Sequence, residues 1–305
     1  MGFSRLAGRR ILVTGASGFI GSRLCRRLPQ IGAEPHGVSR RKQPNDINSM
    51  TWWQGDLSEI IVARNIISEI KPDIVFHLAS HVVGARELDV VLPTFYSNLA
   101  TTINLLTVAS EIGCDRIVLI GSLEEPDETD VIATPSSPYA AAKWACSGYA
   151  RMFHALYETP VSIARLFMVY GPGQQDLRKL IPYVILSLLR GEAPELTSGQ
   201  RQVDWIYVDD VVDGLLAMAL AADTGGQSIE IGSGTLVSIA EVVRQLVEIL
   251  DPTISPLLGA VPDRPMEQIR AANVNDTCSK IDWVPNTPLE EGLQKTVNWY
   301  RQRIK

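Results

Sequence analysis

The chain has 305 residues, of which 46% are hydrophobic and 20% are charged. This length favours one large domain or two coupled domains, and this composition excludes extensive disorder. The 28 lysines and arginines against 34 aspartates and glutamates give a formal net charge of −6, which argues against nucleic acid or an anionic membrane as the main partner. Any anionic ligand must therefore be held by local charges or by backbone dipoles.

Short apolar runs alternate with longer segments of helical period through residues 1–165. Strands separated by helices indicate a parallel sheet with helical crossovers, because parallel neighbours need a long connection. A stripe of isoleucines after Ser58 predicts a helix that Pro72 stops, and Gly113 stands where a helix C-cap glycine belongs. The predicted strands lie at 11–13, 35–38, 52–53, 74–77, 117–120 and 161–164.

Beyond residue 165 the pattern changes, and the Pro-rich segment 252–265 cannot continue a helix. We expect one domain made of residues 1–166 with about 204–234, and a smaller α/β domain made of 167–203 and 235–305, over the open end of the sheet. The expected elements are helices at 180–190, 211–222, 239–250 and 289–303, strands at 205–208 and 229–231, and a polar turn at 196–202.

The four cysteines stand far apart, with no Cys-x-x-Cys pair and no clustered histidine. Their spacing predicts buried free thiols in a reducing compartment, with neither a disulfide framework nor a metal site. The N-terminus lacks the apolar run of a signal peptide, and no stretch approaches about 18 consecutive apolar residues. A cytoplasmic protein without a membrane span is therefore predicted. The four cysteines are Cys25, Cys114, Cys146 and Cys278.

A glycine-rich segment, 14–21 (Thr-Gly-Ala-Ser-Gly-Phe-Ile-Gly), follows the first strand and opens a helix. Its three glycines permit a tight turn, close approach of the backbone to a pyrophosphate, and close contact between helix and sheet. Glycine turns are common, but this position between strand and helix favours a dinucleotide site over a plain turn. The predicted cofactor-binding residues of this segment are Gly15, Ser17, Gly18, Phe19, Ile20 and Gly21.

The residues after the second strand indicate which dinucleotide is bound. An NAD site would offer Asp or Glu to the ribose hydroxyls about 20 residues past the glycines, whereas this chain has Ser39, Arg40 and Arg41. Arginine pairs with a 2′-phosphate, so NADP(H) is favoured and NAD is the less favoured cofactor, with a solvated basic turn as the alternative. Asp56 and Leu57 would lie near the adenine, or Asp56 or Ser58 would cap a helix.

Tyr139 and Lys143 are one helical turn apart and project from the same face of one helix. An ammonium near a phenol lowers the phenol's pKa and lets it exchange a proton with a sugar or alcohol oxygen. A Tyr-x-x-x-Lys spacing also arises by chance, as a surface pair. Ser122 follows the fifth strand at the carboxyl edge where such sheets bind ligands, and the three residues are predicted as a proton-transfer set.

Taken with the glycine loop, these motifs resemble the extended short-chain dehydrogenase/reductase family of nucleotide-sugar epimerases, dehydratases and ketoreductases. The resemblance covers nearly the whole chain and implies a doubly wound Rossmann domain with a smaller domain for a nucleoside-diphosphate sugar. It implies hydride transfer between the nicotinamide and a sugar carbon, and places Leu78, Ala79 and Met168 at the cofactor. The further segments that carry the resemblance are His77–Ala79, Tyr139–Lys143, Arg165–Gly173 and Asp204–Asp210.

Departures from the family pattern sort its subclasses. Dehydratases of this family follow the catalytic Ser or Thr with Asp and then Glu, whereas this chain has Leu123 and Glu124. Leucine cannot donate a proton, so dehydration is disfavoured, and Glu124 is either a catalytic acid or a hydrogen-bonding support. Ketoreductases acting on 4-keto-6-deoxy sugar nucleotides resemble the segment better. A net reductase exchanges its cofactor at every turnover and commonly uses NADPH, in agreement with Arg40 and Arg41.

Residues expected at the sugar nucleotide follow from the same resemblance. The family often has Asn where Met168 stands and Arg where Val203 stands, and Arg201 would supply the missing charge if it projects into the pocket. Arg264 resembles the arginine that reaches the nucleotide, with an exposed loop arginine as the alternative. Two further residues after the fourth strand are candidates for contact with the sugar, although a structural histidine fits the first equally well: His81 and Arg86.

The sequence thus predicts an NADPH-dependent ketoreductase acting on a nucleoside-diphosphate 4-keto-6-deoxy sugar. The alternative is an NAD(P)-dependent nucleotide-sugar epimerase that uses the same residues in both directions, and a remote one is a non-catalytic NADP-sensing protein. A homodimer through the helices around Tyr139 and Leu105 is expected from the family. No metal, nucleic acid or membrane partner is expected.

Overall fold

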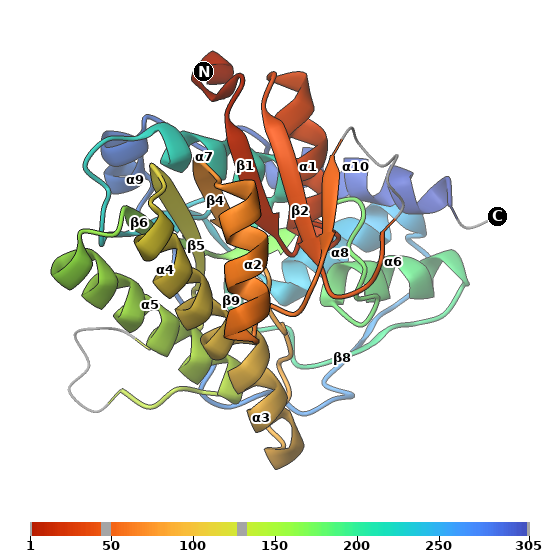
Figure 1. Cartoon of the computed structure of the whole chain (residues 1–305). Helices are drawn as coiled ribbons and strands as arrows, with labels where there is room; N and C mark the ends of the chain where they lie inside the picture. The colour runs from red at the N-terminus through yellow and green to blue at the C-terminus, as the bar shows by residue number, and fades with distance from the viewer. Residues whose placement is uncertain (1, 44–49, 127–132, 304–305) are drawn as a thin grey trace.

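The computed structural model describes residues 2–43, 50–126 and 133–303 (Figure 1). Seven parallel strands form the central sheet in the order β10-β6-β5-β4-β1-β2-β3. The order reverses between β1 and β4, which opens a crevice at the carboxyl ends of these strands. The strands are β1 (Arg10–Thr14), β2 (Glu34–Ser39), β3 (Thr51–Gln54), β4 (Ile74–His77), β5 (Arg116–Ser122), β6 (Val161–Leu166) and β10 (Ser228–Ile231). The six strands predicted within residues 1–165 all lie in this sheet, and the strand predicted at 229–231 is its seventh, β10.

Helices cover both faces of the sheet because successive strand residues point to opposite sides. In β1, Ile11 and Val13 pack in one hydrophobic cluster with α1 and α7, whereas Leu12 packs in another with α2, α4 and α5. The predicted doubly wound Rossmann architecture is therefore confirmed. The covering helices are α1 (Phe19–Gln30), α7 (Val208–Leu220), α2 (Ile60–Ile70), α4 (Thr101–Ile112) and α5 (Pro138–Tyr157).

Three short consecutive helices directly precede α4 in the chain. The last of them is a π-helical turn and carries Asn98, whose side chain is buried and accepts a hydrogen bond from the backbone N–H of His81 at 2.6 Å. Such turns interrupt the regular ladder and occur often at functional sites. The short helices are η1 (Phe3–Leu6) at the N-terminus, then η2 (Leu88–Val90), α3 (Val91–Thr94) and η3 (Phe95–Ala100).

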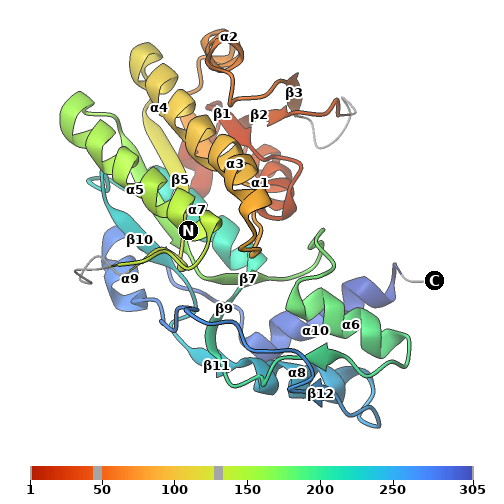
Figure 2. The ribbon, with the colours of Figure 1, turned by 90° about the horizontal axis from the view of Figure 1, so that it is seen from below.

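A second group of elements lies beside the carboxyl end of the sheet and has a hydrophobic cluster of its own. Figure 2 shows α6, α8 and α10 grouped apart from the helices that cover the sheet. The helices of this group are α6 (Leu180–Leu189), α8 (Ile239–Leu250) and α10 (Leu289–Arg301), and α9 (Val274–Ile281) packs instead against β10 and α7. Small sheets complete it, with β7 (Met168–Tyr170), β9 (Gln202–Tyr207) and β11 (Leu236–Ser238) in one, and β8 (Glu195–Leu196) and β12 (Leu257–Leu258) in the other.

Several boundaries differ from the predicted ones. Helix α7 begins at Val208 and not at 211, because Asp209 and Asp210 occupy its first turn, where acidic side chains favour a helix N-terminus. The polar turn expected at 196–202 contains the end of β8 and the start of β9. Glu59 is the N-cap of α2, so neither Asp56 nor Ser58 caps that helix. Helix α9 was not predicted, because it is short and buries only Thr277 and Ile281.

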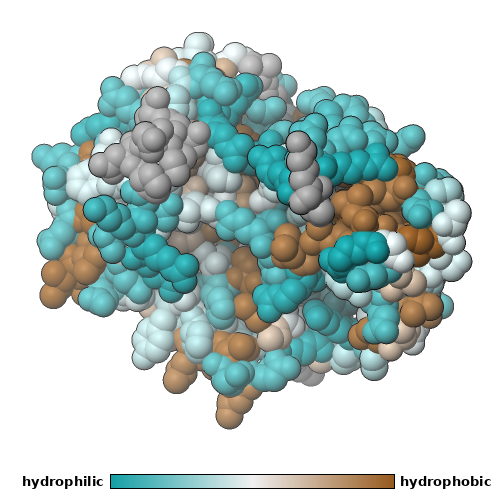
Figure 3. Space-filling view, turned by 90° about the vertical axis from the view of Figure 1, so that its right-hand side faces the viewer, coloured by the Kyte–Doolittle hydropathy of each residue, from teal (hydrophilic) through white to brown (hydrophobic). Residues whose placement is uncertain are grey.

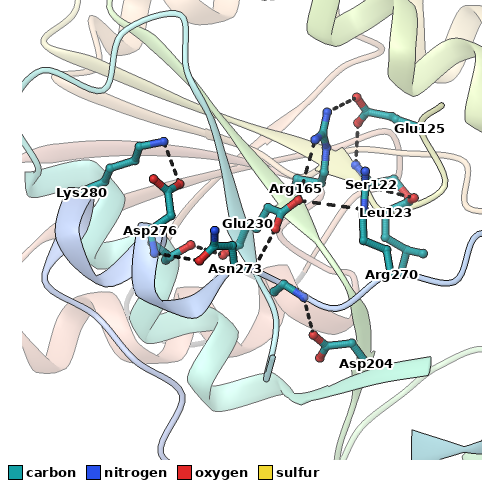
Figure 4. A network of polar contacts seen from close by, with 12 residues as sticks. Ser122, Leu123, Glu125, Arg165, Asp204, Glu230, Arg270, Asn273, Asp276 and Lys280 are labelled. Atoms are coloured by element: carbon teal, nitrogen blue, oxygen red, sulfur yellow. Dashed lines mark hydrogen bonds and ion pairs between the residues drawn. The ribbon is translucent and has the colours of Figure 1, made fainter. Parts of the chain in front are cut away.

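Asp204 joins β9 to two other segments of the chain. Its buried carboxylate accepts hydrogen bonds from the backbone N–H groups of Ser233 at 2.7 Å, Gly234 at 2.9 Å and Ala272 at 2.9 Å (Figure 4). A buried carboxylate is tolerated when donors surround it. Asp204 therefore fixes the loop after β10 and the segment before α9 to β9, the strand that precedes α7.

The surface on the C-terminal side mixes hydrophilic residues with smaller hydrophobic areas (Figure 3). Within residues 2–43, 50–126 and 133–303, no helix is long and apolar enough to cross a bilayer. All four cysteines are free, Cys25 and Cys146 being buried and Cys114 and Cys278 partly exposed.

Candidate active site

The glycine loop connects β1 to α1 at the carboxyl edge of the sheet. Gly15 has a φ of +65°, and a Cβ there would lie 2.8 Å from the backbone N of Ala79. A Cβ at Gly21 would overlap the carbonyl oxygen of Gly15, and one at Gly18 would lie 3.1 Å from the same oxygen. Side chains at Gly15 and Gly21 would clash with the backbone, so these glycines let the loop turn tightly and let α1 pack closely against it, as in loops that bind a dinucleotide pyrophosphate.

Only some of the backbone N–H groups at the N-terminus of α1 are free to bind an anion. Gly18 is its N-cap, and no side chain caps the helix. The Gly18 N–H donates to the carbonyl oxygen of Gly15 at 2.9 Å, so the amides of Phe19 and Ile20 are the better candidates for a phosphate. Ser17 is exposed, and its carbonyl oxygen accepts a hydrogen bond from Gln175 at 2.6 Å.

A buried chain of hydrogen bonds fixes the glycine loop to the neighbouring strand and helix. The Thr14 hydroxyl accepts from the Ala79 N–H at 3.0 Å and contacts His77 Nδ1 at 2.7 Å, and His77 Nε2 contacts the Thr102 hydroxyl at 3.0 Å. Burial, with a further contribution from the charge of Lys143, lowers the pKa of His77 to about 3. The imidazole is therefore neutral and has a structural role here, next to the residues Leu78 and Ala79 that were predicted at the cofactor.

The basic residues predicted for a 2′-phosphate follow β2 directly. Arg40 and Arg41 are exposed, and the Ser39 hydroxyl accepts a hydrogen bond from the Arg41 N–H at 3.2 Å. No ion pair of either arginine is found within the described residues. Asp56 accepts hydrogen bonds from the N–H and hydroxyl of Ser58 at 2.9 and 2.8 Å, so its carboxylate stabilises the turn before α2.

The predicted proton-transfer residues are brought together at the ends of β5 and α5. Ser122 ends β5, and Tyr139 is the second residue of α5, close enough for the Ser122 hydroxyl to lower the pKa of the phenol. The ammonium of Lys143 lies 5.9 Å from the centroid of the Tyr139 ring and donates to the carbonyl oxygen of Ile120 at 2.9 Å. Ser137 caps the helix by accepting from the Ala140 N–H at 3.1 Å, which sets where Tyr139 enters the crevice.

The expected lowering of the Tyr139 pKa by Lys143 was wrong for the free protein. Burial raises the pKa of Tyr139 well above its usual value, the hydrogen bond from Ser122 only partly opposes this, and Glu125 and Glu124 raise it further. Burial also lowers the pKa of Lys143. Tyr139 is therefore protonated in the free protein at neutral pH.

Glu124 and Arg201 form an ion pair that the sequence did not predict. Arg201 Nη2 lies 3.0 Å from Glu124 Oε1, and its Nη1 lies 3.0 Å from Glu267 Oε1. Arg201 therefore reaches the site but is already compensated by two carboxylates, so it does not bring the free positive charge that was expected of it. Val203, at the position of the family arginine, is buried.

Other residues expected at the substrate lie on the loops around this pair. Arg264 is exposed next to Gly84, and the Arg86 guanidinium donates to the carbonyl oxygen of Pro265 at 2.6 Å. The His81 ring has a buried Nδ1 with no hydrogen-bond partner among the described residues, which suits contact with a ligand hydroxyl. Met168 lies on β7 beside this region, partly buried.

Two features were missed by sequence reasoning. Lys179 is partly buried, and burial is the main reason why its pKa is lowered. The charge of Arg264 lowers this pKa further, whereas the carboxylates of Asp176 and Glu124 oppose the shift. Glu125 is fully buried, accepts from the Ser122 N–H and faces Arg165 (Figure 4). Both residues stand beside charged neighbours in the sequence, and no local pattern tells a buried carboxylate from an exposed one.

Comparison with known proteins gives the family. The model of the NAD-dependent epimerase/dehydratase family matches residues 11–232. The chain belongs to this family. A UDP-glucose 4-epimerase of Mycolicibacterium smegmatis is 30% identical over 96% of this chain and 99% of its own length. A dTDP-glucose 4,6-dehydratase of Haemophilus influenzae is also 30% identical, over 95% and 97%.

Solved structures of this family agree over the full length. A UDP-glucose 4-epimerase of Thermotoga maritima, with UDP-glucose, matches with a TM-score of 0.88 at 25% identity, covering 97% of this chain and 100% of its own. MoeE5, in complex with UDP-glucuronic acid and NAD, has a TM-score of 0.84 at 31% identity with the same coverage. The resemblance to the extended short-chain dehydrogenase/reductase enzymes is confirmed. These relatives support the epimerase alternative better than the predicted ketoreductase.

Proposed function

We propose that this protein is an NAD(P)-dependent 4-epimerase of a nucleoside-diphosphate hexose. The observation that carries the proposal is that Ser122 ends β5 beside the start of α5, where the Lys143 ammonium lies 5.9 Å from the centroid of the Tyr139 ring. Relatives named as 4-epimerases support it, and Leu123 in place of a dehydratase acid disfavours elimination of water. UDP-glucose, the ligand of one of the matching structures, is the first substrate to test.

Gly15, Phe19, Ile20 and Gly21 would hold the dinucleotide, and its nicotinamide would supply hydride transfer from the sugar carbon and back to the opposite face of that carbon. Tyr139 takes the proton of the 4-hydroxyl as the carbon is oxidised and gives it back to the oxygen on reduction. Ser122 donates a hydrogen bond to the same oxygen. Lys143, held by the Ile120 carbonyl, supplies the positive charge that favours the phenolate when the crevice is filled.

Incubation of the purified protein with UDP-glucose and NAD⁺ tests the proposal directly. We expect the 4-epimer to form, measured by separation of the two sugar nucleotides, with no net change in the absorbance of the nicotinamide. Ser122→Ala protein prepared in the same way is the control for a contaminating epimerase. Absence of the epimer with UDP-glucose, with its uronate and with the dTDP analogue would contradict the proposal.

A second candidate, the NADPH-dependent ketoreductase, is favoured by Arg40 and Arg41. Both lie exposed at the end of β2, where a 2′-phosphate would lie next to them. Tyr139, protonated in the free protein, suits proton donation to a keto oxygen. Stoichiometric oxidation of NADPH with a 4-keto-6-deoxy sugar nucleotide would identify this activity.

Replacing Arg40 and Arg41 by alanine separates the two cofactors. If they bind the 2′-phosphate, the double variant should bind NADPH about 10- to 100-fold more weakly, because a charge-assisted hydrogen bond contributes about 1.5–3 kcal/mol. Binding of NADH, which lacks that phosphate, should not change. Calorimetric titration of both cofactors measures this, and equal Kd values for NADPH in the variant and the wild type would exclude the role.

The two-domain division at 166, 204 and 234 and the homodimer stay predictions. Exposed apolar side chains on the path from η2 to η3 and on α5 are compatible with a partner subunit there. These side chains are Leu88, Leu92, Phe95, Tyr96 and Tyr149.

A further inference from the structure

Glu125 stands three residues after Ser122 and folds back onto the end of β5. Its carboxylate oxygen Oε1 accepts a hydrogen bond from the Ser122 N–H at 2.6 Å, and its own N–H donates to the Ser122 carbonyl oxygen at 3.1 Å. The side chain is 0% exposed. A Cβ at Gly121 would lie 2.7 Å from Oε1, so glycine there leaves the space that the carboxylate occupies.

The counter-charge of Glu125 is Arg165, on the neighbouring strand β6 (Figure 4). Arg165 is paired with Gly121 in the register of β5 and β6, and its Nη2 lies 3.7 Å from Glu125 Oε2. On its other side, Arg165 Nη1 lies 3.9 Å from Glu230 Oε1, on β10. Arg270 lies 4.0 Å from Glu230 and donates to the carbonyl oxygen of Leu123 at 3.3 Å, which closes the ring of contacts around the Ser122 turn.

We propose that Glu125 is a positioning residue for the reaction: its buried carboxylate fixes the Ser122 turn and places a negative charge, paired with Arg165, at the end of β5 that carries Ser122. An apolar side chain would pack the same space at a lower desolvation cost, because burying an ion pair is expensive. The hydrogen bond from the Ser122 N–H to Glu125 Oε1 is a contact that an apolar side chain could not make, and it accounts for a carboxylate at this position. The proposal takes from the proposed function only that Tyr139 carries the proton.

The charge of Glu125 acts on both of its catalytic neighbours in the same direction. It raises the pKa of Tyr139 and that of Lys143, and so favours the protonated form of each. Tyr139 also faces Ser122, Glu124 and Cys146, besides the ammonium of Lys143. Glu125 thus opposes Lys143 in setting the pH at which Tyr139 loses its proton.

Glu125→Gln removes the charge and keeps an oxygen that accepts from the Ser122 N–H. We expect the pKa of Tyr139 to fall by about one unit in this variant. Ultraviolet titration of tyrosinate measures this pKa. The signal of Tyr139 is the difference between the wild type and Tyr139→Phe, and in the variant background it is the difference between Glu125→Gln and Glu125→Gln/Tyr139→Phe. The acidic limb of kcat/KM for oxidation of the sugar should move to lower pH by the same amount, because Tyr139 must be deprotonated to act as the base.

Glu230→Gln is the matched control, since it changes the same partner, Arg165, without a charge that acts on Tyr139. Its tyrosinate titration should match that of the wild type. An unchanged pKa of Tyr139 in Glu125→Gln, or an equal shift in Glu230→Gln, would overturn the proposal. The titration needs no turnover, so it stands even if the proposed function fails.

If Glu125→Gln does not fold, Glu125→Gln/Arg165→Met removes both charges of the buried pair and so leaves no uncompensated ion. The positive charge of Arg165 is lost as well, so the pKa of Tyr139 should fall by less than in Glu125→Gln. A pKa equal to that of the wild type would again overturn the proposal.

Discussion

Tyr139→Phe should lower the rate of epimerisation by about 10²- to 10⁴-fold, the usual contribution of a positioned acid or base. The phenyl ring keeps the packing of the partly buried side chain, while the hydroxyl is lost. The dinucleotide should bind with nearly the wild-type Kd if, as proposed, the glycine loop holds its pyrophosphate. Turnover of the sugar nucleotide and calorimetric titration of the cofactor measure the two effects.

Tyr149→Phe is the matched control for this variant. Tyr149 lies on the same helix ten residues further on, is 40% exposed, and belongs to no part of the site. Its variant should turn over substrate at the wild-type rate. A Tyr139→Phe enzyme that keeps most of its activity would contradict the mechanism, and one that loses the cofactor as well would show that the hydroxyl acts mainly in binding.

Gly21→Ala should abolish binding of the dinucleotide and lower the free energy of unfolding by about 1–3 kcal/mol. The added Cβ would overlap the Gly15 carbonyl oxygen and lie 2.9 Å from the Gly15 carbonyl carbon. The contacting atoms belong to the backbone, so they cannot rotate away as a flexible side chain does. Either α1 moves away from the sheet or the loop opens, and both displace the amides of Phe19 and Ile20. Urea denaturation and titration with NADH and NADPH measure the outcome.

Gly148→Ala provides the control for an alanine in place of a glycine in a helix. Gly148 lies on α5, and a Cβ there would meet nothing within 4 Å. This variant should be as stable as the wild type or up to about 1 kcal/mol more stable, because alanine is the better helix former. If Gly21→Ala bound the dinucleotide as tightly as Gly148→Ala does, the loop would not be the pyrophosphate site.

Where the sequence predicted correctly, the signal lay within a short segment. The glycine loop is recognisable because it follows an apolar strand directly and opens a helix. Tyr139 and Lys143 share a face because i and i+4 positions always do so in an α-helix. The central strands β1, β4, β5 and β6 are largely apolar and buried because a parallel sheet is covered on both faces.

Where the sequence predicted wrongly, the outcome depended on contacts between distant segments. Arg201 was expected to offer a charge to the substrate, but it pairs with carboxylates 77 and 66 positions away, Glu124 and Glu267. The pKa of Tyr139 was expected to fall, but burial raises it. Neither the partners of an arginine nor the solvent exposure of a phenol is readable from residue spacing.

By itself, the sequence determined the Rossmann architecture and predicted the dinucleotide loop and the Ser122, Tyr139 and Lys143 set, because each depends on the geometry of one strand, turn or helix. Only the tertiary structure decided that Glu125 is buried while its neighbour Glu124 is not. The two acids are adjacent in the chain, but Glu125 faces Arg165 on the neighbouring strand, whereas Glu124 faces Arg201 at the crevice. A carboxylate enters the interior only where a counter-charge and hydrogen-bond donors await it, and here these come from strands that meet only in the folded protein.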